Sequence, residues 1–399
     1  MRETLGHKQK MAAQENTMPA AIVSRMPHIT ALRLQNFRNY IEAACPFGAQ
    51  LNILIGANGM GKTNILEAVS LLGQGRGLRG SQFAELTSKG TNAGWAIGAD
   101  IALPFGESKV RVSYQGEGRV LHMDGDVRKS FEALSAHLPQ LWLTPAMDRL
   151  FVESASGRRK FLDRFAITLN PSLTVALASY EKAMRERNRL LADGVTVSIR
   201  AWLDSLEETM AVQGTAIALA RLDALDLLAA GLSEMPENAF PRARIGLEGE
   251  LELALRSLSM LEVEDQFRQV LVDNRNLDAA AGRSLRGPHR TDFLAYHAGK
   301  DMPAAQCSTG EQKALLVGLI LAQANCVAAR SGDVPLLLLD EVAAHLDVNR
   351  RAALAEVLEH LGGQVWITGT ERHSFSAFNG DAYYVDVDNG MLQPQNVKM

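Results

Sequence analysis

The sequence is poor in cysteine, and its few cysteines show no metal-binding spacing. The chain of 399 residues has three cysteines, Cys45, Cys307 and Cys326. Their number is odd, and no two of them form a C-x-x-C pair. Such a set is typical of reduced thiols in the cytoplasm. We therefore expect free thiols, a cytoplasmic location and, for Cys307, the role of a small packing residue.

An excess of positive charge is missing, and so is a long apolar run. The net charge of -4 argues against a uniformly basic nucleic-acid binder but leaves room for a local basic face. The most apolar stretch begins at Ala314, is interrupted by Gln323 and Asn325, and is too short to span a bilayer. Residues 1–25 lack the apolar core of a signal peptide. We expect no membrane association and a disordered N-terminal extension at residues 1–27.

The chain does contain enough apolar residues for two or three packed domains, since 47% of its residues are hydrophobic and 22% are charged. Residues 28–37 alternate apolar and polar side chains and predict an edge strand, whereas residues 95–130 predict an antiparallel meander. From about residue 158, long helical patterns dominate. We divide the chain into the first part of a head at 28–157, an inserted helical domain at 158–280, and the second part of the head at 281–399.

A glycine-rich loop lies between a predicted strand and a predicted helix. Residues 56–63 match G-x-x-x-x-G-K-[ST] in that structural context. The glycines allow backbone N–H groups to face phosphate oxygens, and the helix start adds partial positive charge. We expect Lys62 to contact the β- and γ-phosphates of ATP and Thr63 to ligate Mg²⁺. The residues expected to bind ATP are Gly56, Ala57, Asn58, Gly59, Met60, Gly61, Lys62, Thr63 and Asn64.

Two adjacent carboxylates follow a run of four leucines near the end of the chain. The run at residues 336–339 predicts a strand that is buried on both faces. We expect Asp340 to hold the Mg²⁺ shell and Glu341 to orient or deprotonate the attacking water. Two acids can also form an ordinary helix N-cap. The phosphate loop favours the catalytic interpretation.

A second anion-friendly helix start, "CSTGEQK" at residues 307–313, raises the question of its use. One triphosphate rarely needs two such sites, but two chains packed head to tail would use both. Asp347, in "AHLD", lies where it can contact the opposite subunit. Taken alone, Ser308 is better explained as an ordinary N-cap with Glu311 in the capping-box position. The residues expected to contact a partner's ATP are Ser308, Gly310, Glu311 and Gln312.

Together these motifs resemble the ABC-type ATPase heads of chromosome-maintenance and recombination proteins. Further stretches resemble the RecF family of bacterial recombination mediators, in the family order and from about residue 28 to the end. These stretches are "LRLQNFRNY" (32–40), "GRRKFLDRF" (157–165), "YEKAMRERNRLL" (180–191), "GPHRTDF" (287–293), "STGEQKALL" (308–316) and "GQVWITGT" (363–370).

The resemblance implies an α/β fold, namely an ABC-type P-loop ATPase head with an antiparallel β subdomain and an inserted, mostly helical domain that forms a short arm. It also implies an ATP-dependent DNA-binding protein of recombinational repair and replication restart, with weak, DNA-stimulated ATPase activity. Such proteins form ATP-dependent homodimers, bind single-strand gaps and single-strand/double-strand junctions, and help RecO and RecR to load RecA.

Some positions depart from the family pattern. Ala146 and Met147 stand where acidic residues are common, with Asp148 shortly after them. Gln140 comes too early to be assigned as the Mg²⁺-sensing glutamine. Thr291 replaces a usual acid, and residues 368–370 stand where many ABC heads have a histidine. These departures leave the rate and geometry of hydrolysis open, but not nucleotide binding.

Basic residues gather in three clusters, at 158–164, 182–189 and 283–290. An acidic protein that binds DNA must concentrate its positive charge in this way. No aromatic residues alternate with the basic ones, so phosphate contacts are expected rather than base stacking. For each cluster a solvated or ion-paired face is at least as good an explanation. The candidates for DNA binding are Arg158, Arg159, Lys160, Arg185, Arg189 and Arg286.

Three hypotheses follow from these motifs. The first is an ATP-switched DNA clamp that closes as a head-to-tail dimer. The second is the ATPase subunit of a membrane transporter, which the helical insertion and the "NFRNY" segment disfavour. The third is a binding module in which ATP is only a structural ligand.

Overall fold

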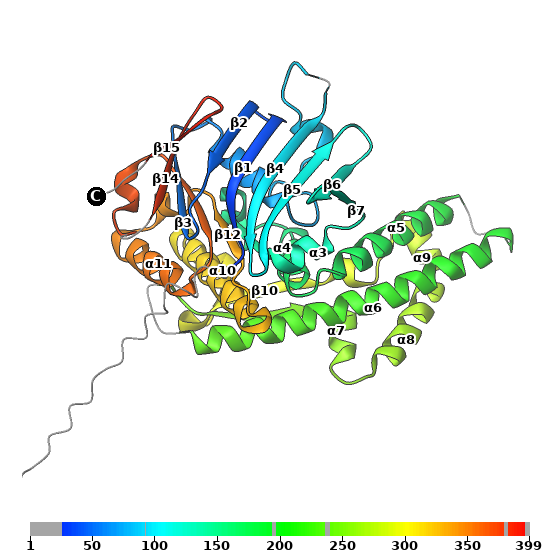
Figure 1. The fold of residues 1–399 in the computed structure, drawn as a ribbon. Helices are drawn as coiled ribbons and strands as arrows, with labels where there is room; N and C mark the ends of the chain where they lie inside the picture. Colours follow the sequence, from blue (N-terminus) through cyan, green and yellow to red (C-terminus); the bar gives the residue numbers. More distant parts are fainter. Residues whose placement is uncertain (1–25, 92, 194–196, 236–239, 379–381, 396–399) are drawn as a thin grey trace, which may run out of the picture.

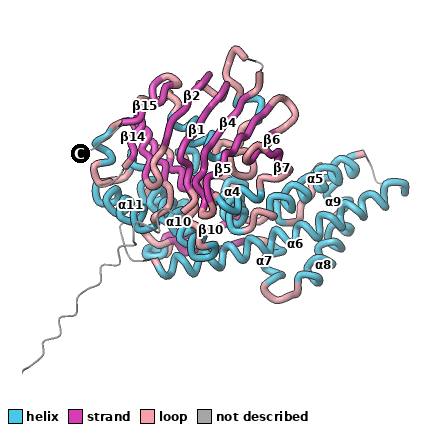
Figure 2. Tube along the Cα trace, viewed as in Figure 1, coloured by secondary structure: helices cyan, strands magenta, loops and turns pink. Residues whose placement is uncertain are grey.

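The computed structural model describes residues 26–91, 93–193, 197–235, 240–378 and 382–395. All but the last two residues of the predicted disordered extension lie outside these ranges. Two sheets and their helices form a broad head, and a helical arm extends from it (Figure 1). Figure 2 shows the same division, with the strands gathered in the head and the arm built from helices.

A six-stranded antiparallel sheet forms one layer of the head, in the order β2-β1-β4-β5-β6-β7. The predicted meander is confirmed. The predicted edge strand is present but lies inside the sheet, because it pairs with β2 on one side and β4 on the other. The strands are β1 (His28–Phe37), β2 (Tyr40–Pro46), β4 (Trp95–Leu103), β5 (Gly106–Tyr114), β6 (Arg119–Met123) and β7 (Asp126–Arg128).

A second six-stranded sheet carries the nucleotide motifs and has the order β15-β14-β3-β13-β12-β8. All its neighbouring strands pair in parallel except β14 and β15. The carboxyl ends of β3 and β12 therefore meet at one edge of the sheet. The strands are β3 (Leu51–Ile55), β8 (Gln140–Leu143), β12 (Leu336–Leu339), β13 (Val365–Gly369), β14 (Tyr383–Asp388) and β15 (Met391–Gln395).

The parallel sheet is buried on both faces, as its leucine run predicted. Leu336 and Leu338 belong to the core shared with the antiparallel sheet and helix α2 (Lys62–Ser70), whereas Leu337 and Leu339 belong to the core on the opposite face. This alternation follows from the two-residue period of a strand. Helix α2 is thus packed between the two sheets, and the phosphate loop precedes it at the sheet edge.

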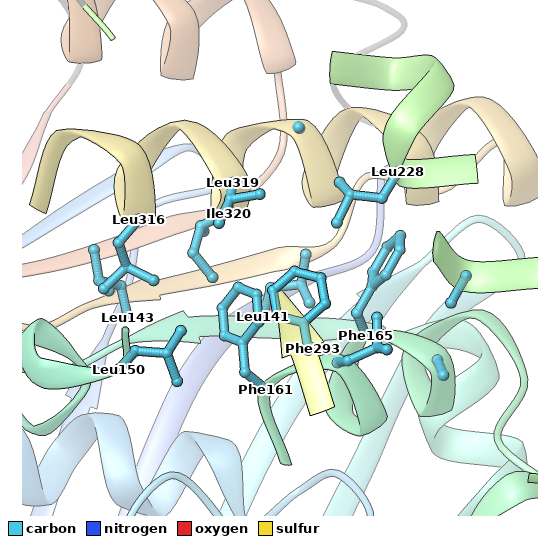
Figure 3. Close-up of a cluster of buried hydrophobic side chains, with 14 of the residues drawn as sticks. Leu141, Leu143, Leu150, Phe161, Phe165, Leu228, Phe293, Leu316, Leu319 and Ile320 are labelled. Atoms are coloured by element: carbon cyan, nitrogen blue, oxygen red, sulfur yellow. The ribbon is translucent and has the colours of Figure 1, made fainter. Parts of the chain in front are cut away.

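The opposite core is built around the long helix α10 (Thr309–Ser331). Leu316, Leu319 and Ile320 on this helix lie near Phe161 and Phe293 (Figure 3). Among the described residues, α10 is the one helix long and apolar enough to cross a membrane, and 72% of its apolar window is buried within the protein. The helix is therefore longer than the apolar run in the sequence suggested. Because most of its apolar window is buried within the protein, α10 is a core helix.

Helices of the arm connect the two parts of the head, and the long α6 packs along α5. A small sheet, β11-β10-β9, joins the arm to the second part of the head, because β9 from the arm pairs with β10. The predicted boundary at residue 281 thus falls between two paired strands. The remaining elements are α3 (Glu132–His137), α4 (Ala155–Leu169), α5 (Leu173–Ala192), α6 (Val197–Glu234), α7 (Glu250–Leu255), α8 (Met260–Asp273), α9 (Arg275–Ala281), α11 (Val348–Leu361), β9 (Ala243–Glu248), β10 (Asp292–His297) and β11 (Met302–Pro303).

Candidate functional site

The phosphate loop joins the end of β3 to the start of α2, as its motif predicts. Gly61 has a φ of 111°, which favours glycine, and a Cβ there would lie 2.5 Å from Asn39 Nδ2. A Cβ on Gly56 would lie 2.2 Å from the carbonyl oxygen of Val387. Close packing therefore requires glycine at both positions, and backbone conformation adds a second reason at Gly61.

The turn between β1 and β2 supports the loop from the other sheet. Asn39 Nδ2 donates to the carbonyl oxygen of Met60 at 3.1 Å, and Tyr40 Oη donates to that of Gly61 at 3.1 Å. Asn64 Nδ2 donates to Asn39 Oδ1 at 2.7 Å. The turn between two strands of the antiparallel sheet thus holds the loop in shape, through Asn39 and Tyr40 of the "NFRNY" segment.

Lys62 lies folded over the loop. Its Nζ donates to the carbonyl oxygens of Gly56 at 2.7 Å and Ala57 at 2.9 Å. Burial lowers the pKa of Lys62, and the charges of Glu341 and Asp340 oppose this effect. A phosphate group would offer this cation a stronger partner than neutral carbonyl groups do.

Thr63 and Asp340 meet as expected, although 277 residues separate them. Thr63 Oγ1 lies 3.0 Å from Asp340 Oδ1 and 2.9 Å from Oδ2. Thr368 Oγ1, on the neighbouring strand β13, lies 2.7 Å from Asp340 Oδ1 and accepts a hydrogen bond from the Glu341 amide at 2.9 Å. Asp340 is 4% exposed, and burial raises its pKa against the opposing hydrogen bonds from Thr368 and Thr63.

These oxygen atoms fit a magnesium ion. Mg²⁺ prefers oxygen ligands and is usually held by one or two carboxylates together with substrate phosphates. The Thr63 hydroxyl and the Asp340 carboxylate face each other across the phosphate loop. A carboxylate whose pKa is raised by burial also gains stability when a cation lies beside it.

Glu341 directly follows Asp340 and has an unusual backbone conformation. Its φ is 52°, in the left-handed region that a residue with a side chain rarely adopts. Such conformations concentrate at functional sites. The turn that begins here leads into the short 3₁₀ helix at Val342–His345.

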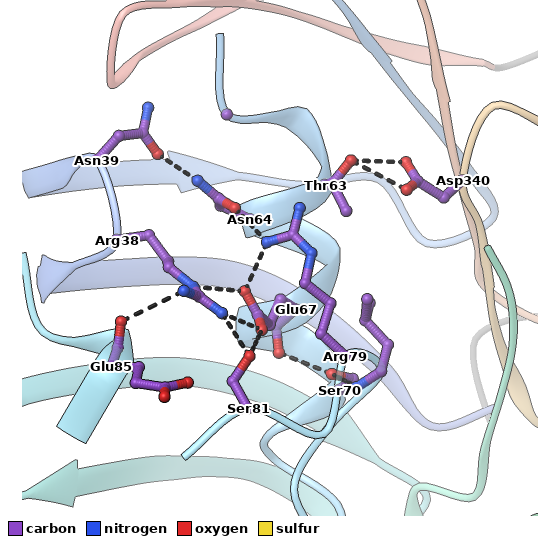
Figure 4. A network of polar contacts seen from close by, with 12 residues as sticks. Arg38, Asn39, Thr63, Asn64, Glu67, Ser70, Arg79, Ser81, Glu85 and Asp340 are labelled. Atoms are coloured by element: carbon purple, nitrogen blue, oxygen red, sulfur yellow. Dashed lines mark hydrogen bonds and ion pairs between the residues drawn. The ribbon is translucent and has the colours of Figure 1, made fainter. Parts of the chain in front are cut away.

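A buried polar network next to the loop was not anticipated from the sequence. Glu67 on α2 is fully buried and forms ion pairs with Arg38 at 2.8 Å and Arg79 at 2.9 Å (Figure 4). Arg79 Nη1 also donates to Asn64 Oδ1 at 2.6 Å. The sequence feature that could have indicated this network is the acidic residue Glu67 on the inner face of the predicted helix after the phosphate loop. Its two partners come from separate loops and could not be assigned.

The Ser308 motif forms the expected capping box at the start of α10. Ser308 Oγ accepts a hydrogen bond from the Glu311 amide at 3.4 Å, and the Ser308 amide donates to Glu311 Oε2 at 3.0 Å. Glu311 also pairs with Lys300, which together with Ser308 lowers the pKa of Glu311 to about 2. Ser308 and Gly310 are exposed. Across the described residues, no recorded hydrogen bond or ion pair joins this motif to the phosphate loop.

The neighbours of Ser308 divide into exposed and internal groups. Gln312 is buried, and its side-chain Nε2 donates to the carbonyl oxygen of Cys307 at 2.8 Å. Gln312 thus supports the loop before α10 from the protein interior. Lys313 is buried too and forms an ion pair with Asp148 at 3.3 Å. Asp347 caps α11 by accepting a hydrogen bond from the Arg350 amide at 2.9 Å.

The positions that depart from the family pattern have defined contacts. Gln140 begins β8 and donates to the carbonyl oxygen of Val69 at 3.3 Å. Thr291 Oγ1 donates to Glu252 at 2.9 Å. Residues 368–370 lie at the end of β13, and His373, the next histidine along the chain, is exposed and lies 3.1 Å from Glu371.

Several DNA-binding candidates have partners within the chain. Arg158 forms an ion pair with Asp292 at 2.7 Å, and Arg159 donates to the carbonyl oxygen of Thr291 at 2.7 Å. Arg286 pairs with Glu250 at 2.6 Å, and Arg185 pairs with Glu181 at 3.6 Å. The exposed candidates are Lys160, Arg185, Arg189 and Arg286.

The three cysteines are free and buried, as expected. Burial raises the pKa of the Cys45 thiol to about 12 and that of Cys326 to about 11. These thiols therefore behave as packing residues.

Comparison with known proteins gives one consistent result. Residues 28–391 match the family described as RecF/RecN/SMC N terminal domain. The DNA replication and repair protein RecF of Brucella suis biovar 1 (strain 1330) is 46% identical over 369 residues, which cover 91% of this chain and 95% of that protein.

Two solved structures resemble the chain over most of its length. They are described as the recombination mediator protein RecF-ATPrS and RecF-ATP in the RecFOR pathway. The RecF-ATPrS structure has a TM-score of 0.81 and the RecF-ATP structure one of 0.77, each at 25% sequence identity. Both matches cover 93% of this chain, and they cover 98% and 99% of the two solved chains, respectively. The predicted α/β ABC-type ATPase-head fold is confirmed.

Proposed function

The chain belongs to the RecF family of DNA replication and repair proteins, and from this premise we propose that it is an ATP-dependent DNA-binding protein of recombinational repair and replication restart. One observation supports the ATP-dependent part above all. Lys62 and Thr63 at the start of α2 meet Asp340 at one sheet edge, although 277 residues separate Thr63 from Asp340.

In the proposed site, Lys62 binds the β- and γ-phosphates, while the backbone amides from Gly56 to Asn64 surround the phosphate oxygens. Thr63 and Asp340 hold Mg²⁺, which neutralises phosphate charge when bound. Thr368 holds the Asp340 carboxylate in place through its 2.7 Å hydrogen bond. Glu341 orients the attacking water and accepts its proton, so that ATP is hydrolysed to ADP and phosphate.

We further propose that the site is completed by a second copy of the chain. Ser308, Gly310 and Glu311 are presented at the start of a helix whose first amide groups can face an anion. Gln312 supports this loop and Asp347 lies close to the interface. ATP bound by one chain would contact the Ser308 motif of the other, so that ATP binding stabilises a head-to-tail homodimer.

DNA is the proposed ligand of the closed dimer. Lys160, Arg185 and Arg189 are better placed to meet phosphate groups than Arg158 and Arg159, which are engaged inside the chain. By family membership, the DNA is a single-strand gap or a single-strand/double-strand junction, RecO and RecR are partners, and RecA is loaded as a result. A cytoplasmic location and weak, DNA-stimulated turnover complete the proposal.

The transporter alternative loses its support with the family assignment, since the similar proteins are named for DNA replication and repair. The alternative of ATP as a structural ligand remains testable. Turnover measured with and without junction DNA decides it, because stimulation by DNA contradicts a structural role.

Sedimentation of the full chain tests the proposal as a whole. We expect a monomer without nucleotide, a dimer with ATP and Mg²⁺, and a dimer–DNA complex with gapped DNA. A chain that binds ATP but stays monomeric at every concentration would refute the shared-site mechanism. A dimer that does not bind gapped DNA would refute the proposed DNA-binding function.

A further inference from the structure

A cavity of about 440 Å³ lies where the head meets the arm. Its walls are the glycine-rich loop at residues 73–80, the start of β8 at Gln140 and Trp142, and the helices α4 and α5 at Arg164 and Leu177. The phosphate loop and the Asp340–Glu341 pair are not among its lining residues. The cavity is therefore separate from the ATP site, and its volume is in the range of small-molecule sites.

Arg164 is the most unusual group in the cavity. Its guanidinium carbon lies 4.6 Å from the centre of the Trp142 ring and 5.5 Å from that of Phe161. Among the described residues, its terminal nitrogens hydrogen-bond to the Met147 sulfur alone, at 3.7 and 3.8 Å, and its buried Nε has no hydrogen-bond partner. The neighbouring Asp163 pairs with Arg221 instead.

Arg164 is partly buried, with its Nε shielded from solvent, and a guanidinium withdrawn from water without a carboxylate is costly because the cation needs an acceptor. Burial lowers the pKa of Arg164 to about 9, so the group is still charged at neutral pH. The Arg164 guanidinium would therefore be stabilised by a hydrogen-bond acceptor or an anion from outside the chain.

Further polar groups on the cavity wall also lack partners. Gln140 is 6% exposed, and its Oε1 has no hydrogen-bond donor, whereas its Nε2 is engaged with Val69. The buried hydroxyl groups of Ser135 and Thr174 are unpartnered as well. The lining thus combines one free acceptor with several donors.

The rest of the lining suits a flat, anionic ligand. Leu138, Ile167 and Leu177 supply apolar surface next to the Trp142 ring. Arg76 and Lys160 are exposed on the lining, and neither has a recorded ion pair within the described residues. A planar ring would fit beside Trp142, and a negative group would fit near Arg76 and Lys160.

We propose that this cavity binds one nucleotide, distinct from the ATP of the phosphate loop. A heteroaromatic base carries both donors and acceptors, as Gln140, Arg164 and the two hydroxyl groups require, and its ring offers the flat apolar face. Its phosphate meets Arg76 and Lys160. The nucleotide comes either from solution or from an unpaired position of bound DNA, and the second source rests on the proposed DNA-binding function.

The first experiment uses the free mononucleotides dAMP and dTMP as probes. The full chain carries Lys62→Ala, which removes binding at the phosphate loop, and affinity is measured by calorimetry with and without Arg164→Met. Methionine keeps an apolar chain of similar length but removes the charge and the donors. We expect Arg164→Met to weaken mononucleotide binding by about tenfold or more.

Arg268→Met is the matched control, because Arg268 is an exposed arginine on α8 paired with Asp265 and Glu208. It should leave mononucleotide affinity unchanged. The single variant Arg164→Met, with Lys62 intact, should bind ATP with the same affinity as the parent chain. That result would show that the head of the variant is folded. If Arg164→Met does not fold, Leu177→Trp fills the cavity instead and should have the same effect on mononucleotide binding.

The second experiment tests the DNA source with gapped DNA that carries 2-aminopurine at an unpaired position. The fluorescence of this base should change on binding to the parent chain and change much less with Arg164→Met, at DNA concentrations that saturate both. An Arg164-dependent signal without mononucleotide binding assigns the cavity to DNA, and mononucleotide binding without that signal assigns it to free nucleotide.

If neither measurement depends on Arg164 or Leu177, no nucleotide binds in the cavity and the inference is wrong. This failure is distinct from failure of the proposed function. ATP-dependent dimerisation does not involve the cavity, and it is measured by sedimentation on the parent chain and on the single variant Arg164→Met, both with Lys62 intact.

Discussion

Two helix starts of this chain are the proposed anion sites, and they are built in opposite ways. The start of α2 is buried and is held by residues of both sheets, among them Tyr40 and Asp340. The start of α10 is exposed and is held by its own capping box and Lys300. Both use the same amide groups and helix dipole. The surroundings thus bury the first start and leave the second exposed, as its proposed contact with a partner requires.

A third helix start shows that the capping box alone does not indicate function. Ser259 at the start of α8 forms the same box with Glu262, with its amide 2.8 Å from Glu262 Oε2. This box lies on the arm, away from the nucleotide motifs. Its location makes it an internal control for Ser308.

Replacement of Lys62 should have the largest effect. Lys62→Ala removes the one buried cation of the loop, so ATP affinity should fall by at least about 100-fold, as expected for the loss of a desolvated charge contact. ATP-dependent dimerisation and turnover should disappear with it. Calorimetry with ATP and Mg²⁺ measures the affinity, and thermal unfolding without ligand verifies the fold. Unchanged affinity would mean that the buried start of α2 is not the ATP site.

Glu341→Gln should separate ATP binding from chemistry. The amide keeps the size of the side chain but cannot accept a proton, so turnover should fall by about 100-fold or more. ATP affinity should stay within about twofold, and the dimer should persist longer after ATP addition. Single-turnover hydrolysis and sedimentation measure the two effects. Turnover near the parent rate would assign the base to another residue.

Ser308→Arg tests the exposed helix start directly. The larger, charged side chain should block the partner's nucleotide and lower ATP-dependent dimerisation and turnover by about tenfold or more, while ATP affinity of the monomer is preserved. Ser259→Arg breaks the equivalent box on α8 and should leave dimerisation intact. Equal behaviour of the two variants would show that Ser308 is an N-cap and nothing more.

The pH dependence should be moderate and should follow Asp340. Burial raises its pKa above the usual value of about 3.9, so protonation begins at a higher pH than for an exposed aspartate. Affinity for ATP with Mg²⁺ should therefore decrease, by less than about tenfold, as the pH falls from 7 toward 5.

The free energy of unfolding without ligand should change in the opposite direction. A raised pKa means that the folded state binds the proton more tightly, so the Asp340 contribution becomes more favourable as the pH falls through this window. Asp340→Asn removes both trends and serves as the control. A pH profile of ATP affinity that is the same in Asp340→Asn would exclude Asp340 as the titrating group.

Lys300→Ala should have the smallest effect. Its ion pair with Glu311 is exposed, and such pairs contribute little. Dimerisation should change by less than about twofold, because Ser308 and the start of α10 remain. A large loss would show that the partner contacts Lys300 itself, and sedimentation with ATP would reveal it.

Local patterns in the sequence predicted much of the fold because they reflect local physics. The phosphate loop lies between a strand and a helix, and the leucine run at 336–339 is buried on both faces. The capping box of Ser308 is present because its four residues are consecutive. The strand at residues 28–37 was also predicted correctly, but its position inside the sheet was not, since alternation does not reveal which strands pair.

By itself, the sequence determined the elements, the nucleotide motifs and the family of this protein. Those features depend on residues within a few positions of one another or on spacing along the chain. Only the tertiary structure decided which distant groups meet. It placed Thr63 beside Asp340, gave buried Glu67 its two arginines, turned Arg158 toward Asp292 and left Arg164 without a carboxylate. Each of these outcomes depends on packing between sheets and helices far apart in the chain, and no local pattern encodes it.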